Sequence, residues 1–393
     1  MTPKGKKTST RLVHAGRDAD AFKGKVNPSI ERASTILAKD VSGLYGQTKS
    51  LYGRMGLETH DVLKTGLCEL ENASHAQLAG NGLNACALAL ASCVGAGDHI
   101  IASDSIYGPT RRFCEDYLQR MGVETSFVPP NFGTDIQNHI RENTKVIFLE
   151  MPGSLTFELH EIDPIVEAAR SRGITTIMDN TWGAGISCRP LDLGVDISVQ
   201  ALTKYVIGHS DGFGGAAMTN SASLAAMLQR TANDWGISMS PDDCYLAQRG
   251  LRSLALRMKT QGESSLRLAE FLDAHPSVQA VLHPALPCHP DHDLWKKYFT
   301  GTAGLFSFCL APVSEAALNT FFETLTLFGF GFSWGGFESL IIPCDPQLKR
   351  TSSPYWTSGT HGHLIRVSVG LEDPDDIISD MSAALSACAN CEV

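Results

Sequence analysis

The chain has 393 residues, of which 43% are hydrophobic and 19% are charged, and its formal net charge is −10. This length predicts two or three domains, each with a core of its own. The acidic balance argues against a nucleic-acid-binding surface, and no apolar run reaches the roughly 18 residues of a membrane span, so we expect a soluble, cytoplasmic protein.

The first sixty residues are rich in Gly, Ser and Lys and show little periodicity. This composition predicts an extended arm, and such arms often belong to an oligomer rather than to the core of their own subunit. We expect three parts, which are an arm at 1–60, a large domain at 61–255 and a smaller domain at 256–393.

Short β-branched or apolar runs alternate with helical patterns from about residue 60 to 255. This alternation is typical of a parallel sheet covered by helices. The expected strands are 75–79, 99–103, 125–129, 145–150, 175–179 and 196–202. The expected helices include 85–94, 110–121 and 163–173, of which the last has Gly173 as its C-cap.

Beyond this region, the segment 245–276 has a long helical pattern, and strands are expected at 304–311 and 364–370. These elements predict a smaller α+β domain. Between them lies the run HPALPCHPDHD at 283–293, whose prolines and polar residues predict a surface loop. The run collects His and Cys residues, but we expect no metal site there.

Eleven cysteines are scattered through apolar segments, without the density of a disulfide scaffold. Buried thiols in a reducing compartment explain most of them. Cys388 and Cys391 have the spacing of half a metal site or of a redox pair, but no second CxxC completes a zinc ribbon. We therefore assign this pair no role.

The segment AGNGLNA at 79–85 is a glycine-rich turn between a predicted strand and a predicted helix, which suits a phosphate group. Gly80, Gly82 and Ala85 also fit the dinucleotide fingerprint, with Asp104 about 20 residues further on as a ribose-binding acid. The preceding segment makes a poor buried first strand. The turn therefore predicts a phosphate site, and an NAD-dependent dehydrogenase stays as an alternative.

Two charged residues follow neighbouring predicted strands. Asp179 ends the strand 175–179, where open α/β sheets bind ligands, although a helix N-cap would also explain it. Lys204 follows the next strand, and alone it is explained by a surface salt bridge. A phosphate turn, a carboxylate and a lysine together match pyridoxal 5′-phosphate (PLP), which needs amides for its phosphate, an acid for its ring nitrogen and an amine for a Schiff base.

These residues resemble the Cys/Met-metabolism family of PLP enzymes, within the fold-type I aminotransferase-like group. The resemblance covers about residues 10–385. It implies an α/β fold, with a mainly parallel sheet in a large PLP-binding domain and a smaller α+β substrate-binding domain at the C-terminus. It also implies a homo-oligomer, commonly a tetramer of two active dimers.

For the cofactor, the resemblance implies that Lys204 in TKYVIGHSD forms the Schiff base and acts as the general base during turnover. Thr203 would help to hold the phosphate. Asp179 in DNTWGAG would pair with the pyridine nitrogen, and Tyr107 in SDSIYGPT would stack on the cofactor ring. Lys204, Tyr107 and Asp179 are thus the implied catalytic residues.

Four further residues complete the implied phosphate site. Gly82 and Leu83 would supply backbone amides. Tyr52 and Arg54 in YGRMGLETH match a Tyr-x-Arg motif that reaches the phosphate of a neighbouring subunit. This match would make the N-terminal arm part of the active site of another subunit.

For the substrate, Arg366 in LIRVSVGLED matches the arginine that grips the α-carboxylate, and a guanidinium fork suits such a group. Ser333 and Trp334 in FSWGGFESL match residues that line the same pocket. Gly153 and Ser154 resemble the β-lyase branch of the family, whereas γ-lyases and γ-synthases usually have Asn-Pro there.

Three positions depart from the family pattern. Ala201 stands where a serine is usual, Met55 takes the place of a second arginine found in some β-lyases, and Phe332 replaces a frequent tyrosine. These changes bear on the choice of substrate, including recognition of its distal carboxylate, more than on the cofactor chemistry.

The implied reaction is β-elimination of L-cystathionine to homocysteine, pyruvate and ammonia, in methionine biosynthesis by transsulfuration. Cystine and cysteine are alternative β-substituted substrates. A sibling γ-lyase, γ-synthase or sulfhydrylase is an alternative enzyme, and a catalytically idle PLP-binding protein is an alternative from another class. The intact set of Lys204, Asp179, Tyr107 and Arg366 argues against the idle protein.

Overall fold

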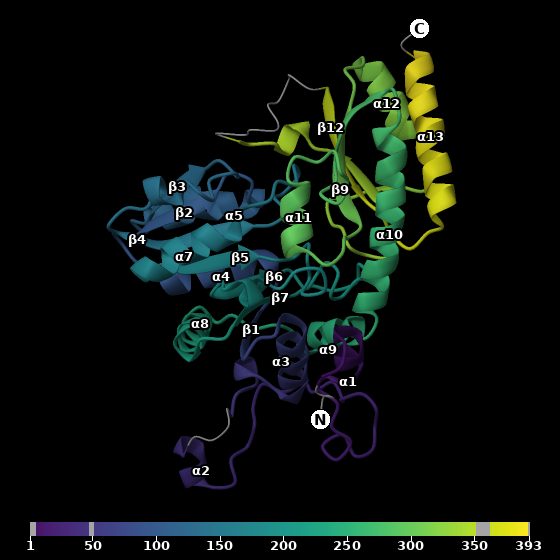
Figure 1. The fold of residues 1–393 in the computed structure, drawn as a ribbon. Helices are drawn as coiled ribbons and strands as arrows, with labels where there is room; N and C mark the ends of the chain where they lie inside the picture. The colour runs from purple at the N-terminus through teal and green to yellow at the C-terminus, as the bar shows by residue number, and fades with distance from the viewer. Residues whose placement is uncertain (1–4, 47–50, 351–361, 392–393) are drawn as a thin grey trace.

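The computed structural model describes residues 5–46, 51–350 and 362–391, which form two sheets with helices packed around them (Figure 1). The larger sheet has seven strands in the order β1-β7-β6-β5-β4-β2-β3. Its strands are β1 (His75–Ala79), β2 (His99–Ser103), β3 (Glu124–Val128), β4 (Thr144–Glu150), β5 (Thr175–Asp179), β6 (Ile197–Gln200) and β7 (Gly215–Thr219).

The group β6-β5-β4-β2-β3 is parallel throughout, whereas β7 pairs antiparallel with both β6 and β1. The predicted mainly parallel sheet is therefore confirmed. The strand β1 lies at the sheet edge, and its first three residues are exposed or half-buried. An edge position explains the weak apolar pattern of this segment.

The sequence patterns do not predict β7, whose residues GAAMT are mostly small and have low strand propensity. Close packing requires this small size, because a Cβ at Gly215 would lie 2.2 Å from the backbone oxygen of Asn81. The strand thus allows the start of helix α4 (Gly82–Cys93) to lie against the sheet.

Both faces of the large sheet are buried. Along β4, Ile147 and Leu149 belong to one hydrophobic core, which includes residues of α7 (Ile162–Arg172). Val146 and Phe148 point the other way into a second core, which includes residues of α4. Near-continuous apolar strands of this kind are what a sheet covered on both faces requires.

The predicted helices are present, with differences at their ends. The segment 85–94 is α4, and 163–173 is α7, which ends at Gly173 in the left-handed conformation with φ of +66°. The segment 110–121 begins as α5 (Gly108–Arg112) and continues into a π-helical segment, η2 (Phe113–Leu118).

The predicted long helix at 245–276 is two helices, α9 (Pro241–Leu251) and α10 (Leu254–Asp273). The chain turns at Arg252 and Ser253. Arg257 donates to the carbonyl of Gly250 at 2.9 Å and to that of Tyr205 at 2.7 Å, so its side chain satisfies the backbone at the break. A buried arginine in the first turn of the next helix therefore stabilises this boundary.

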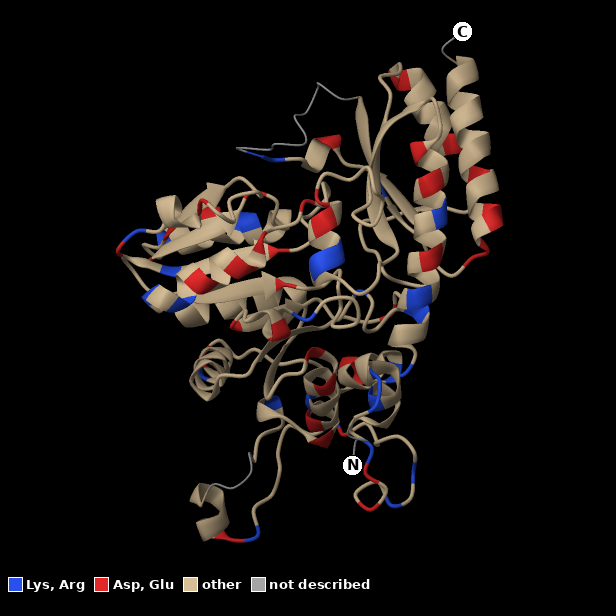
Figure 2. Cartoon of the chain, viewed as in Figure 1, with Lys and Arg blue, Asp and Glu red and all other residues tan. Residues whose placement is uncertain are grey.

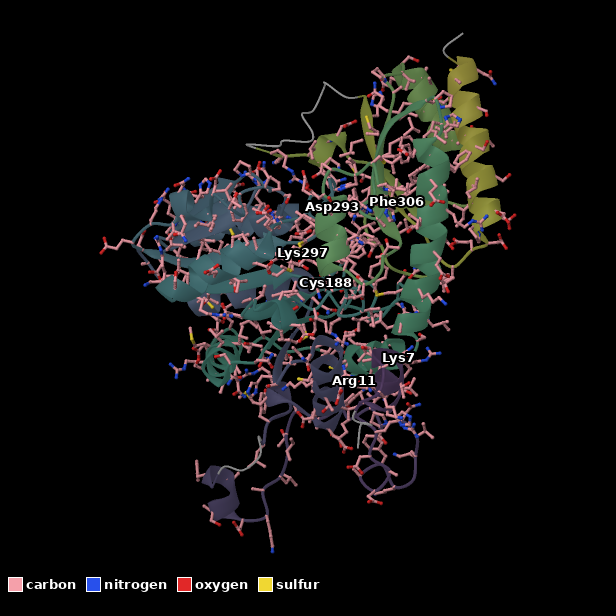
Figure 3. All side chains as sticks on the ribbon, in the orientation of Figure 1. Lys7, Arg11, Cys188, Asp293, Lys297 and Phe306 are labelled. Carbon is pink, nitrogen blue, oxygen red and sulfur yellow. The ribbon has the colours of Figure 1, made fainter. Side chains whose placement is uncertain are left out.

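The second sheet has five strands in the order β10-β11-β12-β9-β8. They are β8 (Val278–Leu282), β9 (Leu305–Leu310), β10 (Gly329–Phe330), β11 (Leu340–Pro343) and β12 (His363–Ser368). Figure 1 shows α10, α12 (Glu315–Thr324) and α13 (Pro374–Cys391) beside this sheet. Phe306 on β9, labelled in Figure 3, is fully buried in the core between them.

The N-terminal segment is only partly extended. Helix α1 (Thr8–His14) packs against α3 (Glu58–Glu71) and buries Leu12 in the core of its own chain. The segment that carries α2 (Val41–Tyr45) projects from the body in Figure 1, and Leu37 is 89% exposed. The division of the chain at residues 60 and 255 stays a prediction.

The run HPALPCHPDHD is a loop, as its prolines predict, but only part of it lies at the surface, where Pro287, Cys288 and Pro290 are exposed. His283, Leu286 and His289 are buried, and the Nε2 of His283 lies 3.3 Å from the hydroxyl of Ser265 on α10. The run leads into α11 (His292–Tyr298), whose Lys297, labelled in Figure 3, forms an ion pair with Asp163 of α7 at 2.6 Å. The run is therefore a connection with buried histidines and an exposed proline-containing side.

Charged residues of both signs are mixed along α10 and α11 (Figure 2). Within the described residues, every helix is too short or too polar to span a bilayer. Over the same residues, no three His, Cys, Asp or Glu side chains are arranged to hold a metal ion.

Candidate active site

A cavity of about 460 Å³ lies beside the carboxyl ends of β4, β5 and β6, with Arg366 of β12 in its wall. Open α/β sheets bind their ligands at this edge. Among the predicted site residues, those that line the cavity are Gly82, Leu83, Tyr107, Asp179, Thr203, Lys204, Trp334 and Arg366. The fold therefore brings most of the predicted site together.

The start of α4 forms one end of the cavity. The side chain of Asn81, the N-cap, accepts from the amide of Asn84, while the amides of Gly82 and Leu83 come too early in the helix for an intrahelical partner. Residue 82 must be glycine, because a Cβ there would lie 2.4 Å from the Cβ of Ala201. Amides at this positive end of the helix dipole suit a phosphate group.

Asp179 ends β5 and is 8% exposed. Its Oδ1 accepts from the amide of Thr181 at 2.9 Å and from the Thr181 hydroxyl at 2.5 Å, which closes a turn rather than capping a helix. Burial raises the pKa of the Asp179 carboxyl, and the bonds from Thr181 oppose that rise. The other oxygen, Oδ2, accepts from the thiol of Cys86 at 3.5 Å.

Lys204 is half-buried in the cavity wall. Its Nζ donates to the hydroxyl of Ser333 at 3.1 Å and lies 5.3 Å from the centre of the Trp334 ring. Burial lowers the pKa of Lys204 to about 8, with a further lowering by Arg366 and an opposing effect of Asp179. A neutral amine is thus accessible near neutral pH, as a Schiff-base lysine requires.

Tyr107 stands just before α5 at the cavity wall. Its amide donates to Oε2 of Glu150 at 2.6 Å. Glu150 lines the same cavity and ends β4, as Asp179 ends β5. The strand-end signal that identified Asp179 therefore applies equally to Glu150, which was not among the predicted site residues.

Arg366 is 9% exposed on β12, between β9 and β11. Its Nη2 donates to the carbonyl oxygens of Phe332 at 2.8 Å and Ser333 at 3.3 Å. These bonds hold the guanidinium at the cavity wall and use only some of its five donors. The remaining donors can receive a carboxylate.

The loop that contains Ser333 and Trp334 packs on the residue after the lysine. The rings of Trp334 and Tyr205 meet edge to face with centroids 5.3 Å apart, and Tyr205 is fully buried. Gly335 follows with φ of +78°, a conformation that favours glycine. This packing fixes Ser333 beside the amine of Lys204.

Three predicted phosphate contacts are less direct. The Thr203 hydroxyl lines the cavity but is bonded to the backbone of Gly214. Tyr52 is 52% exposed, and Arg54 donates to the carbonyl of Asn233 at 3.4 Å, so neither lines the cavity of its own chain. Their contact with a neighbouring subunit stays a prediction.

Asp104 does not serve as a ribose-binding acid. Its side chain is completely buried and forms an ion pair with Arg111 of α5. The Gly80-x-Gly82 turn is thus not followed by the available acid that a dinucleotide site needs. This removes the main support for the NAD-dependent alternative.

The chemistry of the cavity fits PLP. Helix amides lie at one end, a buried carboxylate lies on the floor, and a lysine with a lowered pKa lies in the wall. Glycine at position 82 lets the start of α4 lie close to Ala201, so that its amides stand beside the residues that follow β6. Asp179, Lys204 and the start of α4 are the groups that would hold the cofactor.

Comparison with known proteins agrees with this fit. The sequence profile of the Cys/Met metabolism PLP-dependent enzymes matches residues 9–386. The chain is 40% identical over 390 residues to cystathionine beta-lyase MetC of Escherichia coli, covering 97% of this chain and 98% of that protein. Other curated cystathionine beta-lyases match at 37–41% identity.

Two further relatives have names other than cystathionine beta-lyase. An L-alanine/L-glutamate racemase of Wolbachia pipientis is 38% identical over 396 residues, covering 97% of each chain. The crystal structure of metB from Corynebacterium glutamicum superposes with a TM-score of 0.91 at 29% identity, covering 98% of this chain and 99% of that one. These matches confirm the predicted fold class.

Proposed function

The chain belongs to the Cys/Met metabolism PLP-dependent enzymes, and from that premise we propose that it is a carbon–sulfur β-lyase that cleaves L-cystathionine to homocysteine, pyruvate and ammonia. The enzyme uses PLP, as its family does. The observation that carries the proposal is the meeting of Lys204, Asp179 and Arg366 in one cavity. The near-full-length similarity to curated cystathionine beta-lyases supports it.

When bound, PLP supplies an aldehyde that takes the substrate amine and a ring that stabilises negative charge at Cα. Arg366 binds the α-carboxylate with its remaining donors. Lys204, held by Ser333 and with a pKa of about 8, removes the α-proton as a neutral amine. A base placed in this way typically contributes about 10²–10⁴ in rate.

Asp179 keeps a proton on the ring nitrogen, because a buried carboxylate stabilises the adjacent cation. The electron pair freed from the Cα–H bond forms the Cα–Cβ double bond, and the Cβ–S bond breaks with its pair on sulfur. Homocysteine leaves as the thiolate and takes up a proton. Water then converts the remaining three-carbon fragment to pyruvate and ammonia.

Incubation of the purified enzyme with cystathionine tests this reaction. Pyruvate and homocysteine are the expected products. Formation of 2-oxobutyrate and cysteine would identify a γ-lyase instead, and a yellow protein without any product would be a PLP-binding protein without this activity. Parallel incubations with cystine and cysteine rank the β-substituted substrates.

Amino-acid racemisation is a second candidate, favoured by the 38% identity to the Wolbachia racemase. Both reactions begin with removal of the α-proton, so Lys204 could serve either. Alanine carries no leaving group at Cβ, so it cannot undergo β-elimination, and return of a proton to the opposite face of Cα gives the D-isomer. D-alanine formed from L-alanine at a rate comparable with pyruvate formation would favour the racemase.

We also propose that the active unit is a cytoplasmic homo-oligomer, a tetramer of two active dimers. The projecting segment around α2 supports an oligomer, because Leu37 and Tyr45 are 89% and 81% exposed there. Tyr52 and Arg54 follow this segment and lie outside their own cavity. Light scattering on the holoenzyme measures the mass, and a monomer would contradict the proposal.

A further inference from the structure

Cys86 lies on the cavity floor, one turn into α4 after the phosphate-binding amides. It is 1% exposed, and its Sγ is 3.5 Å from Oδ2 of Asp179. The two residues are separated by 93 positions in the chain. The thiol therefore contacts the carboxylate that, in the proposed function, binds the ring nitrogen of PLP.

The hydrogen bonds of Asp179 leave one oxygen for the cofactor. Each carboxylate oxygen has about two lone-pair sites. The two donors of Thr181 occupy Oδ1, so Oδ2 is the oxygen with room for a ring nitrogen. Cys86 also donates to Oδ2. The thiol and the N–H of the PLP ring would therefore share this oxygen.

A thiol differs from a hydroxyl in this position. Burial, followed by the nearby Asp179 charge, raises the pKa of Cys86 well above its usual range, so the group remains an S–H donor. An S–H is a weak donor, and a stronger donor to the charged form of an acid would lower the proton affinity of that acid. A weak donor leaves Asp179 more basic.

We propose that Cys86 is a positioning residue, which fills the place beside Oδ2 of Asp179 with a donor too weak to lower the basicity of this oxygen much, so that Asp179 can hold a proton on the PLP ring nitrogen. The proposal rests on the role of Asp179 in the proposed function. It assigns to a buried thiol an electronic effect on the cofactor that packing alone would not produce.

Two substitutions separate the electronic effect from packing. Cys86→Ser offers a stronger donor, and Cys86→Val keeps an apolar side chain of similar size without a donor. Cys114→Ser is the matched control, because Cys114 is equally buried in the same core but does not line the cavity. The wild type and these three variants are all prepared with PLP.

The first measurement is the pH at which the visible absorbance of bound PLP titrates. Protonation of the ring nitrogen withdraws electrons and lowers that pH. Cys86→Ser should raise it by about 0.5–1 unit, a fraction of the shift expected for a whole hydrogen bond to a charged group, because the thiol already donates weakly. Cys86→Val should lower it or leave it unchanged. Cys114→Ser should reproduce the wild-type titration.

The second measurement is the dissociation constant of PLP, and the third is kcat and KM for cystathionine. Cys86→Ser should weaken PLP binding about three- to ten-fold and lower kcat by a similar factor with little change in KM. Cys86→Val should retain PLP affinity. A packing role would instead impair both variants without opposite shifts in the titration.

Equal shifts of the same sign in Cys86→Ser and Cys86→Val would overturn the proposal, as would a wild-type titration in Cys86→Ser. Failure of the proposed function has a different signature, because the wild-type protein would then bind PLP and titrate without releasing pyruvate. The titration and the dissociation constant test Cys86 in either case.

Discussion

Glu150 and Asp179 are register partners at the carboxyl ends of the adjacent strands β4 and β5, so two carboxyl groups share one cavity. Burial and the charge of Asp179 raise the pKa of Glu150 well above its usual range. Oε2 of Glu150 accepts the amide of Tyr107 at 2.6 Å. Glu150 therefore holds the loop carrying Tyr107 by accepting its backbone amide.

Glu150→Gln should keep kcat within about three-fold of wild type, because an amide oxygen can accept the same bond from the amide of Tyr107. Glu150→Ala should lower kcat about ten-fold, since the amide of Tyr107 loses its acceptor in the cavity wall. Steady-state kinetics with cystathionine compares the two. Equal impairment of both variants would contradict the role of Glu150 as the acceptor of this bond.

Lys204→Ala should reduce kcat by at least about 10²–10⁴, because the substrate loses its general base. The visible absorbance of covalently bound PLP should disappear while the circular dichroism spectrum stays unchanged. Lys259→Ala is the control, since Lys259 lies exposed on α10 in an ion pair with Glu263. An unchanged PLP spectrum in Lys204→Ala would remove Lys204 from the site.

Asp179→Asn should still bind PLP but lose most of its kcat. The amide keeps the size of the side chain and an oxygen for the Thr181 bonds, yet it lacks the negative charge that keeps the ring nitrogen protonated. Absorbance of the bound cofactor and kcat are the measurements. A kcat near that of wild type would show that the electron sink does not need Asp179.

Arg366→Ala should raise KM for cystathionine about 10- to 100-fold, because a hydrogen bond to a charged group contributes about 1.5–3 kcal/mol. Arg267→Ala is the control, since Arg267 pairs with Asp375 at the surface of α10. KM and kcat are measured at saturating PLP. A wild-type KM in Arg366→Ala would contradict its contact with the α-carboxylate.

The lowered pKa of Lys204 also predicts a pH dependence of stability in the protein without PLP. Burial lowers the pKa from 10.5 to about 8, so between these values the unfolded chain binds more protons than the folded one. The contribution of Lys204 to the free energy of unfolding therefore rises with pH between these two pKa values. Lys204→Met should stabilise the PLP-free protein below about pH 8, and the gain should shrink towards about pH 10.

Urea unfolding of PLP-free wild type and Lys204→Met at several pH values measures this difference. Lys259→Met changes an exposed lysine on α10 and should show little pH-dependent difference from wild type. A gain in the free energy of unfolding of Lys204→Met that stays constant between about pH 7 and 10 would mean that burial does not lower the pKa of Lys204.

Local patterns account for much of the large sheet. The expected strands 75–79, 99–103 and 175–179 coincide with β1, β2 and β5. The β-branched residues of β2 and β5, and the turns around all three strands, depend only on neighbours in sequence. The pattern fails for β7, whose first residue, Gly215, is required by the closeness of Asn81 rather than by strand propensity.

The candidate site also has residues that the sequence reveals and contacts that only the fold reveals. The glycine turn at Gly82, the strand-end Asp179 and the lysine Lys204 are visible in the sequence, because each occupies a recognisable place next to a strand or helix. The ion pair that removes Asp104 from consideration is also local, but it depends on how α5 folds back over β2. A motif alone could not exclude a dinucleotide site.

The sequence by itself determined where strands and helices alternate and which residue types stand at the strand ends. Only the tertiary structure decided that Cys86 contacts Asp179, that Glu150 holds the amide of Tyr107, and that Ser333 reaches Lys204. The physical reason is the distance along the chain. Contacts between residues 43, 93 and 129 positions apart leave no periodic trace, because they arise only when sheets and loops pack together.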